Sequence, residues 1–124
     1  MISAKVIHGG AVAAGLGYPT ANLDIQDNDF LVQPGVYAAY AKLHGREHEA
    51  VLVVQDQPRK IEVHLFGYSG THLYGSTLAV DPLKRVSDIV SFLTREELLA
   101  KINNDIRLVR EVFLSGNYKL KIIN

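Results

Sequence analysis

The sequence predicts a mainly β fold, a small antiparallel barrel or sandwich covered by one late helix. Short apolar runs with glycine-rich turns between them fill the middle of the chain, and one amphipathic helical pattern follows them. The 124 residues are about the size of a single domain, and no repeat or low-complexity linker divides them. We therefore expect one domain over residues 1–124.

The strands are predicted from apolar patterns in the middle and at the end of the chain. Apolar residues alternate faces through Gly35–Leu43, and the Gly45 that follows predicts a hairpin turn. Residues 49–55 form a nearly continuous apolar run, which is typical of a strand covered on both faces. We expect further strands over residues 73–80 and, after the helix, over residues 118–122.

A strand over residues 60–66 carries the first candidate functional side chain. Its residues alternate, which places Glu62 and His64 on one face and apolar residues on the other. The carboxylate of Glu62 either faces solvent or lines a cavity, where desolvation would raise its pKa and suit it to general-base catalysis. His64 either orients Glu62 or is a neutral histidine hydrogen-bonded within the structure.

The helix is predicted from its start signal and its apolar stripe. Thr94 and Glu97 have the spacing of a capping box, in which each side chain binds a free backbone N–H of the first turn. The apolar stripe recurs at spacings of three and four and consists of Leu98, Ile102, Ile106, Val109 and Phe113. The pattern ends near Gly116, and we expect the stripe to serve packing.

A glycine-rich segment near the start of the chain is the second candidate site. Residues 6–23 contain no charged side chain, but their glycines and proline would make a poor membrane helix, so we interpret them as a loop. Within it, Thr20 offers a hydroxyl for Mg²⁺ or phosphate, and Asn22 offers an amide. The alternative is an ordinary turn.

Composition excludes several classes of function. Thirteen basic residues balance thirteen acidic ones, so the chain lacks the basic field that binding to nucleic acid or to anionic membranes relies on. The absence of cysteine excludes disulfides, thiolate nucleophiles and cysteine-ligated metals. The histidines show no zinc-site spacing. We expect a cytoplasmic monomer that does not associate with membranes.

The motifs together resemble the riboflavin kinase family from about residue 8 to residue 105. They are His8-Gly9, Gly17-Tyr18-Pro19-Thr20-Ala21-Asn22-Leu23, Pro34-Gly35-Val36-Tyr37-Ala38, Ile61-Glu62-Val63-His64-Leu65, Leu73-Tyr74-Gly75, and Phe92-x-Thr94-x-x-Glu97-Leu98 with Ile102 and Asp105. The resemblance implies a six-stranded antiparallel Greek-key barrel with a C-terminal α-helix. It also implies Mg²⁺-dependent (or other divalent-cation-dependent) transfer of the ATP γ-phosphate to the 5′-hydroxyl of riboflavin, which gives FMN and ADP.

The resemblance also implies roles for individual residues. Gly9 and Gly17 would form the nucleotide loop, and Thr20 and Asn22 would bind the metal ion and the nucleotide phosphates. Glu62 would accept the proton of the ribityl hydroxyl, and the three side chains would converge inside the mouth of the barrel. The residues expected on the flavin side are Tyr74, Lys84, Arg85 and Asp88.

The chain departs from the family pattern at several charged positions. A basic residue is usual where Ala14 stands, and a Leu-Arg-x-Glu sequence is usual where the chain has Val86-Ser87-Asp88-Ile89. The alternative is therefore a divergent flavin- or nucleotide-binding module of the same fold with weak or no kinase activity. A nucleic-acid-binding or regulatory barrel is disfavoured by the balanced charge. Bacterial relatives often carry an FMN adenylyltransferase domain that this sequence lacks, so we expect no FAD synthesis.

Overall fold

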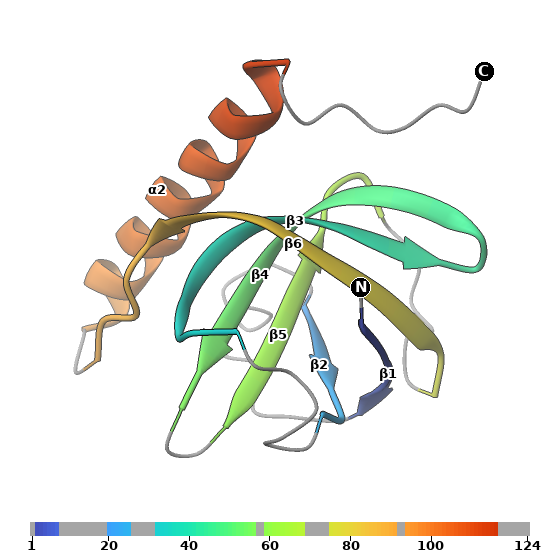
Figure 1. Ribbon diagram of the computed structural model, residues 1–124. Coiled ribbons are helices and arrows are strands. Elements are labelled where there is room, and N and C mark those ends of the chain that lie inside the picture. Colours follow the sequence, from blue (N-terminus) through green and yellow to red (C-terminus); the bar gives the residue numbers. More distant parts are fainter. Residues whose placement is uncertain are drawn as a thin grey trace.

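The computed structural model describes residues 2–7, 20–25, 32–56, 59–68, 75–91 and 94–116. In this part of the chain six antiparallel strands close into a barrel, and a helix lies along one side of it (Figure 1). The elements are β1 (Ile2–Ile7), β2 (Ala21–Leu23), β3 (Gly35–Leu43), β4 (Arg46–Gln55), β5 (Lys60–Leu65), β6 (Thr77–Ser87) and α2 (Arg95–Leu114). The predicted barrel with a C-terminal helix is confirmed.

The strands follow one another around the barrel in the order β1-β2-β5-β4-β3-β6, and β6 pairs with β1 to close the ring. β3 and β4 form the predicted hairpin, in register from Gly35 opposite Val54 to Leu43 opposite Arg46. The turn residues His44 and Gly45 both have positive φ, 50° and 79°, as a two-residue turn with the twist of a hairpin requires.

Two sequence-based boundaries were wrong. Val6 belongs to β1 and pairs with Leu23 of β2, so strands occupy both ends of the segment that we expected to be a loop. The strand expected over residues 73–80 instead begins at Thr77 and continues through Pro82 to Ser87. Proline is tolerated there because the pairing with β3 changes register next to Ala39, the partner of Pro82. Residues 73–74 and 118–122 lie outside the described residues.

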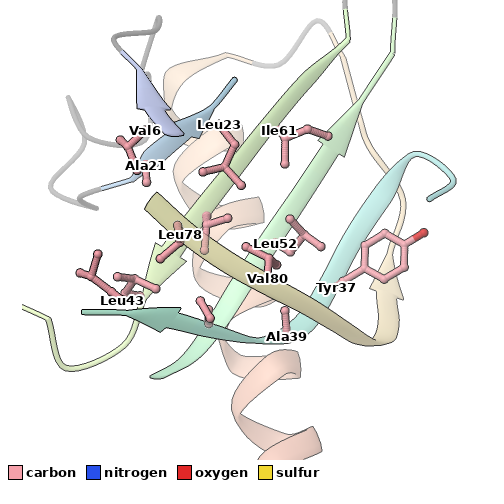
Figure 2. Packing of buried hydrophobic residues seen from close by; sticks show 14 of the residues in the cluster. Val6, Ala21, Leu23, Tyr37, Ala39, Leu43, Leu52, Ile61, Leu78 and Val80 are labelled. Carbon is pink, nitrogen blue, oxygen red and sulfur yellow. The ribbon is translucent and has the colours of Figure 1, made fainter. Parts of the chain in front are cut away.

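The barrel interior is a continuous apolar core. Inward-facing residues from all six strands fill it, and several of them are shown in Figure 2. The interior residues that have no exposed surface include Leu52, Leu78, Val80, Ala39 and Ala50. A barrel of this size holds side chains and no channel, so any ligand site must lie at an end or on the outer wall.

A second, smaller core joins the outer wall to α2. Val36, Ala38 and Val51 of the sheet pack against Val109 and Phe113 of the helix. The second half of α2 therefore fixes the helix to the barrel.

Candidate active site

A cavity of about 260 Å³ lies between the outer wall of the barrel and the first half of α2. Its lining combines apolar side chains from both elements with a few ionisable ones. The lining residues are Thr20, Val36, Val51, Val53, Gln55, Lys60, Glu62, His64, Ile89, Val90, Leu98, Lys101, Ile102, Asp105 and Ile106. A mostly apolar cavity with a few convergent polar groups is typical of a small-molecule site.

The apolar stripe of α2 divides between two roles. Val109 and Phe113 are buried against the sheet, as predicted. Leu98, Ile102 and Ile106, which precede them on the same stripe, line the cavity. Ile106 also packs against the second core, so the prediction that the stripe serves packing was wrong for Leu98 and Ile102 only. Periodicity identifies an apolar face without identifying what the face contacts.

Glu62 and Thr20 line the same cavity, and Asn22 is the direct cross-strand partner of Glu62. Ala21 and Leu23 belong to the barrel interior, so the side chain of Asn22 between them points to the outer wall, as that of Glu62 does. The predicted convergence of the three residues is thus present, but not inside the mouth of the barrel. The interior is filled with apolar side chains, and the polar groups lie on the outer wall, where Thr20 and Glu62 line the cavity that α2 also borders.

Two oxygens beside this cavity have no hydrogen-bond partner. Thr20 Oγ1 and Asn22 Oδ1 are buried and unpaired within the described part of the chain. A buried polar atom without a partner destabilises the fold, so such atoms are rare, and a bound ion is one of the explanations for them. Hydroxyl and amide oxygens are ligands that Mg²⁺ accepts, so the two residues fit a divalent cation. The described residues contain no group of three or more His, Asp or Glu side chains arranged to hold a metal.

The carboxylate of Glu62 has a cation beside it. Lys60 Nζ lies 3.0 Å from Glu62 Oε1, and both side chains are mostly buried, with exposed fractions of 30% and 17%. His64 also lines the cavity, with its ring packed edge-on against Phe66 at 5.5 Å between centroids. The alternative in which Glu62 simply faces solvent is therefore wrong.

A polar network that the sequence analysis missed lies in the wall of the cavity. Ser87 Oγ donates to Asp105 Oδ1 at 2.6 Å, and Lys101 Nζ donates to Asp105 Oδ2 at 2.6 Å and to Ser87 Oγ at 3.1 Å. Asp105 is 6% exposed. The i,i+4 spacing of Lys101 and Asp105 was the available signal, but such pairs are usually solvent-exposed.

The other predicted site residues lie elsewhere. Gly9, Gly17 and Tyr74 are outside the described residues. Lys84, Arg85 and Asp88 are exposed and do not line the cavity.

Arg85 is held by partners away from the cavity. It donates to the carbonyl oxygen of Pro34 at 3.0 and 3.2 Å and pairs with Asp88 at 2.7 Å. The hydrogen bond with Asp88 raises the pKa of Arg85 above its ordinary value. Arg85 and Asp88 thus pair with each other and do not line the cavity.

No helix in the described ranges has the length and apolar character needed to span a lipid bilayer.

Comparison with known proteins identifies relatives in bacteria. The sequence profile of the flavokinase family, described as riboflavin kinase, matches residues 1–113. A bifunctional riboflavin kinase/FMN adenylyltransferase of Buchnera aphidicola subsp. Schizaphis graminum is 30% identical over 90% of this chain and 38% of the relative. A protein of the same name from Bacillus subtilis is 31% identical over 84% of this chain and 35% of the relative. The chain thus spans little more than a third of these relatives.

Two solved structures resemble the fold. A crystal structure described as a macrolide-efflux protein from Streptococcus pneumoniae has a TM-score of 0.79 and 27% sequence identity, over 94% of this chain and 38% of that one. Riboflavin kinase from Trypanosoma brucei has a TM-score of 0.67 over 90% of this chain and 75% of that one, and its 17% identity supports the fold alone. The family profile, which covers nearly the whole sequence, shows that the chain belongs to the riboflavin kinase family.

Proposed function

We propose that the chain, acting as one domain, transfers the γ-phosphoryl group of ATP to the 5′-hydroxyl of riboflavin and so forms FMN. One observation carries this proposal: Glu62 lines one cavity with Thr20 and pairs across the sheet with Asn22, and the oxygens of Thr20 and Asn22 have no hydrogen-bond partner among the described residues. Membership of the riboflavin kinase family supports the same reaction. A monomeric state and a cytoplasmic location stay predictions.

The cavity suits the acceptor because its walls are apolar on both sides. Ile102 and Ile106 of α2 face the barrel wall that carries Val53. A flat aromatic ring fills such a space and buries its apolar faces. The proposal places the isoalloxazine ring of riboflavin there, with the end of the ribityl chain at Glu62. It assigns ring binding to the cavity residues and not to Lys84, Arg85 or Asp88.

In the proposed reaction, the oxygen of the riboflavin 5′-hydroxyl forms a bond to the γ-phosphorus of ATP. Glu62 accepts the proton of that hydroxyl. The bond from that phosphorus to the bridging oxygen breaks, and ADP leaves with the electron pair. Proton transfer to a positioned carboxylate contributes a factor of roughly 10²–10⁴ in rate. Lys60, 3.0 Å from Glu62, balances the negative charge of the carboxylate before the proton arrives.

Thr20 and Asn22 are the residues that we assign to the divalent cation, Mg²⁺ in this proposal. The support is their pair of buried oxygens, which have no hydrogen-bond partner in the described part of the chain. Mg²⁺ is commonly held by a few protein oxygens together with phosphates and waters. When bound, it neutralises charge on the transferring phosphates. The family resemblance adds Gly9 and Gly17, which lie outside the described residues, as the proposed nucleotide loop.

Two measurements distinguish this function from the alternative of a flavin- or nucleotide-binding module without turnover. The chain is mixed with riboflavin and Mg-ATP, FMN is measured by chromatography, and riboflavin binding is measured by calorimetry. Formation of FMN supports the kinase. Riboflavin binding without FMN supports the binding module, which the uncharged residues Ala14, Ser87 and Ile89 motivate. Absence of both overturns each proposal.

A further inference from the structure

Lys101 and Asp105 form an ion pair inside the wall of an otherwise apolar cavity. The side chain of Lys101 is 20% exposed and that of Asp105 is 9% exposed. Both residues line the cavity together with Ile102 and Ile106. Ser87, the last residue of β6, holds both of them through its hydroxyl. The pair is therefore fixed in place from a second element of the fold.

The same helix carries a matched pair that lies in solvent. Arg107 and Glu111 have the same i,i+4 spacing and a distance of 2.7 Å, but their exposed fractions are 60% and 56%. Exposed pairs of this kind lose little solvation. A buried pair loses solvation without a reliable gain in stability. A contribution to stability therefore does not explain why the Lys101–Asp105 pair lies in the cavity wall.

The network leaves hydrogen-bonding capacity on two side chains that line the cavity. A lysine ammonium group has three N–H donors, and within the described residues Lys101 uses two of them, toward Ser87 and Asp105. Each carboxylate oxygen of Asp105 accepts one hydrogen bond and has a second lone pair. A cavity ligand thus meets a charged donor and a charged acceptor side by side.

We propose that the Lys101–Asp105 pair recognises the imide edge of the isoalloxazine ring. Lys101 donates to a ring carbonyl oxygen, and Asp105 accepts from the adjacent N3–H. This inference rests on riboflavin being the acceptor in the proposed function. The cation of the pair comes from α2, and the hydroxyl that holds it comes from the end of β6.

Binding of riboflavin and of 3-methylriboflavin, which lacks the N3–H, tests the proposal. Dissociation constants are measured by quenching of flavin fluorescence, at equal salt concentration. The unmodified protein should bind riboflavin about 10- to 100-fold more tightly than 3-methylriboflavin, as expected for a hydrogen bond to a charged group. Equal affinities for the two flavins in the unmodified protein would overturn the proposal without any substitution.

Substitutions then assign the preference to the pair. The double variant Lys101→Met with Asp105→Leu should bind the two flavins with equal affinity, because it removes the donor and the acceptor together. The matched control, Arg107→Met with Glu111→Leu, should keep the full preference. Thermal melting reports whether each variant folds. If the double variant fails to fold, Asp105→Asn and Lys101→Gln test the two contacts separately, and each should reduce the ratio of the two affinities.

The results distinguish flavin recognition by the Lys101–Asp105 pair from the proposed riboflavin kinase activity. If the unmodified protein forms FMN but the variants keep the preference for riboflavin, recognition by the pair is wrong and the kinase proposal stands. If the unmodified protein neither binds riboflavin nor forms FMN, both are wrong.

Discussion

Asn22 and Glu62 are direct partners across the ladder that joins β2 to β5. β2 has only three residues, so this short strand places the backbone of Asn22 beside that of Glu62 and brings Thr20, which precedes the strand, to the same cavity. Closure of the barrel through β2 thus connects the proposed metal ligands to the proposed base.

We expect Glu62→Gln to lower kcat by roughly 10²–10⁴ while the KM for riboflavin changes little, because the amide keeps the shape of the side chain but cannot accept the proton. The measurement is FMN formation at saturating Mg-ATP. Glu111→Gln, on the exposed face of α2, is the control and should leave kcat unchanged. Equal kcat values for Glu62→Gln and the unmodified protein would contradict the role of Glu62 as base.

Thr20→Val should weaken the binding of Mg-ADP without lowering the stability of the fold. Valine has nearly the same shape as threonine but removes the buried hydroxyl, which has no hydrogen-bond partner within the described ranges. We expect the affinity for Mg-ADP to fall by on the order of 1–3 kcal/mol, while the free energy of unfolding stays equal or increases. Calorimetry with and without Mg²⁺ and denaturant unfolding measure the two effects. A loss of stability with unchanged affinity would mean that the hydroxyl is structural.

The two halves of the α2 stripe should respond differently to truncation. Val109 has no exposed surface, so Val109→Ala should lower the free energy of unfolding by about 2 kcal/mol through lost burial and a cavity. Ile102 lines the ligand cavity, so Ile102→Ala should cost less stability and raise the Kd for riboflavin. Unfolding curves and flavin titrations of both variants check this contrast. Identical stability losses with unchanged flavin affinity would count against the cavity as the flavin site.

The capping box should make the start of α2 sensitive to acid. The backbone hydrogen bond from Thr94, and next its side-chain hydrogen bond, lower the pKa of Glu97 below its ordinary value of 4.5. A carboxylate with a lowered folded-state pKa contributes stability above its unfolded pKa, and that contribution is lost as the pH falls through the folded-state pKa.

The melting temperatures of the unmodified protein and of Glu97→Gln should therefore differ at pH 7 and converge as the pH falls below 4.5. Melting measured by circular dichroism across this range is the test. A difference that stays constant from pH 7 to pH 3 would show that the charge of Glu97 does not stabilise the helix.

Local signals predicted the parts of the fold that depend on nearby residues. The β3–β4 hairpin follows from two apolar runs around Gly45, and the start of α2 follows from the Thr94–Glu97 spacing; both are confirmed. β2 could not be predicted from its own residues, because three residues show no periodicity and its stability comes from pairing with β1 and β5. The length of β6 depends equally on its pairing with β3.

Of the candidate site, only individual side chains could be identified from the sequence. Thr20, Asn22 and Glu62 could be singled out from their residue types and surroundings. The cavity could not, because it exists only where the first half of α2 faces the barrel wall across a gap. Lys101 and Asp105 look in the sequence like an ordinary exposed helical pair, and only the packing of α2 beside Ser87 brings them into the wall.

Each strand of the barrel has a hydrogen-bonded neighbour on both sides. In the described part of the chain no strand ends the sheet, so the barrel is a poorer template for amyloid-like association and strand exchange than an open sheet is. A unit of this kind can be joined to unrelated sequences in gene fusions with little risk of misassembly through its sheet.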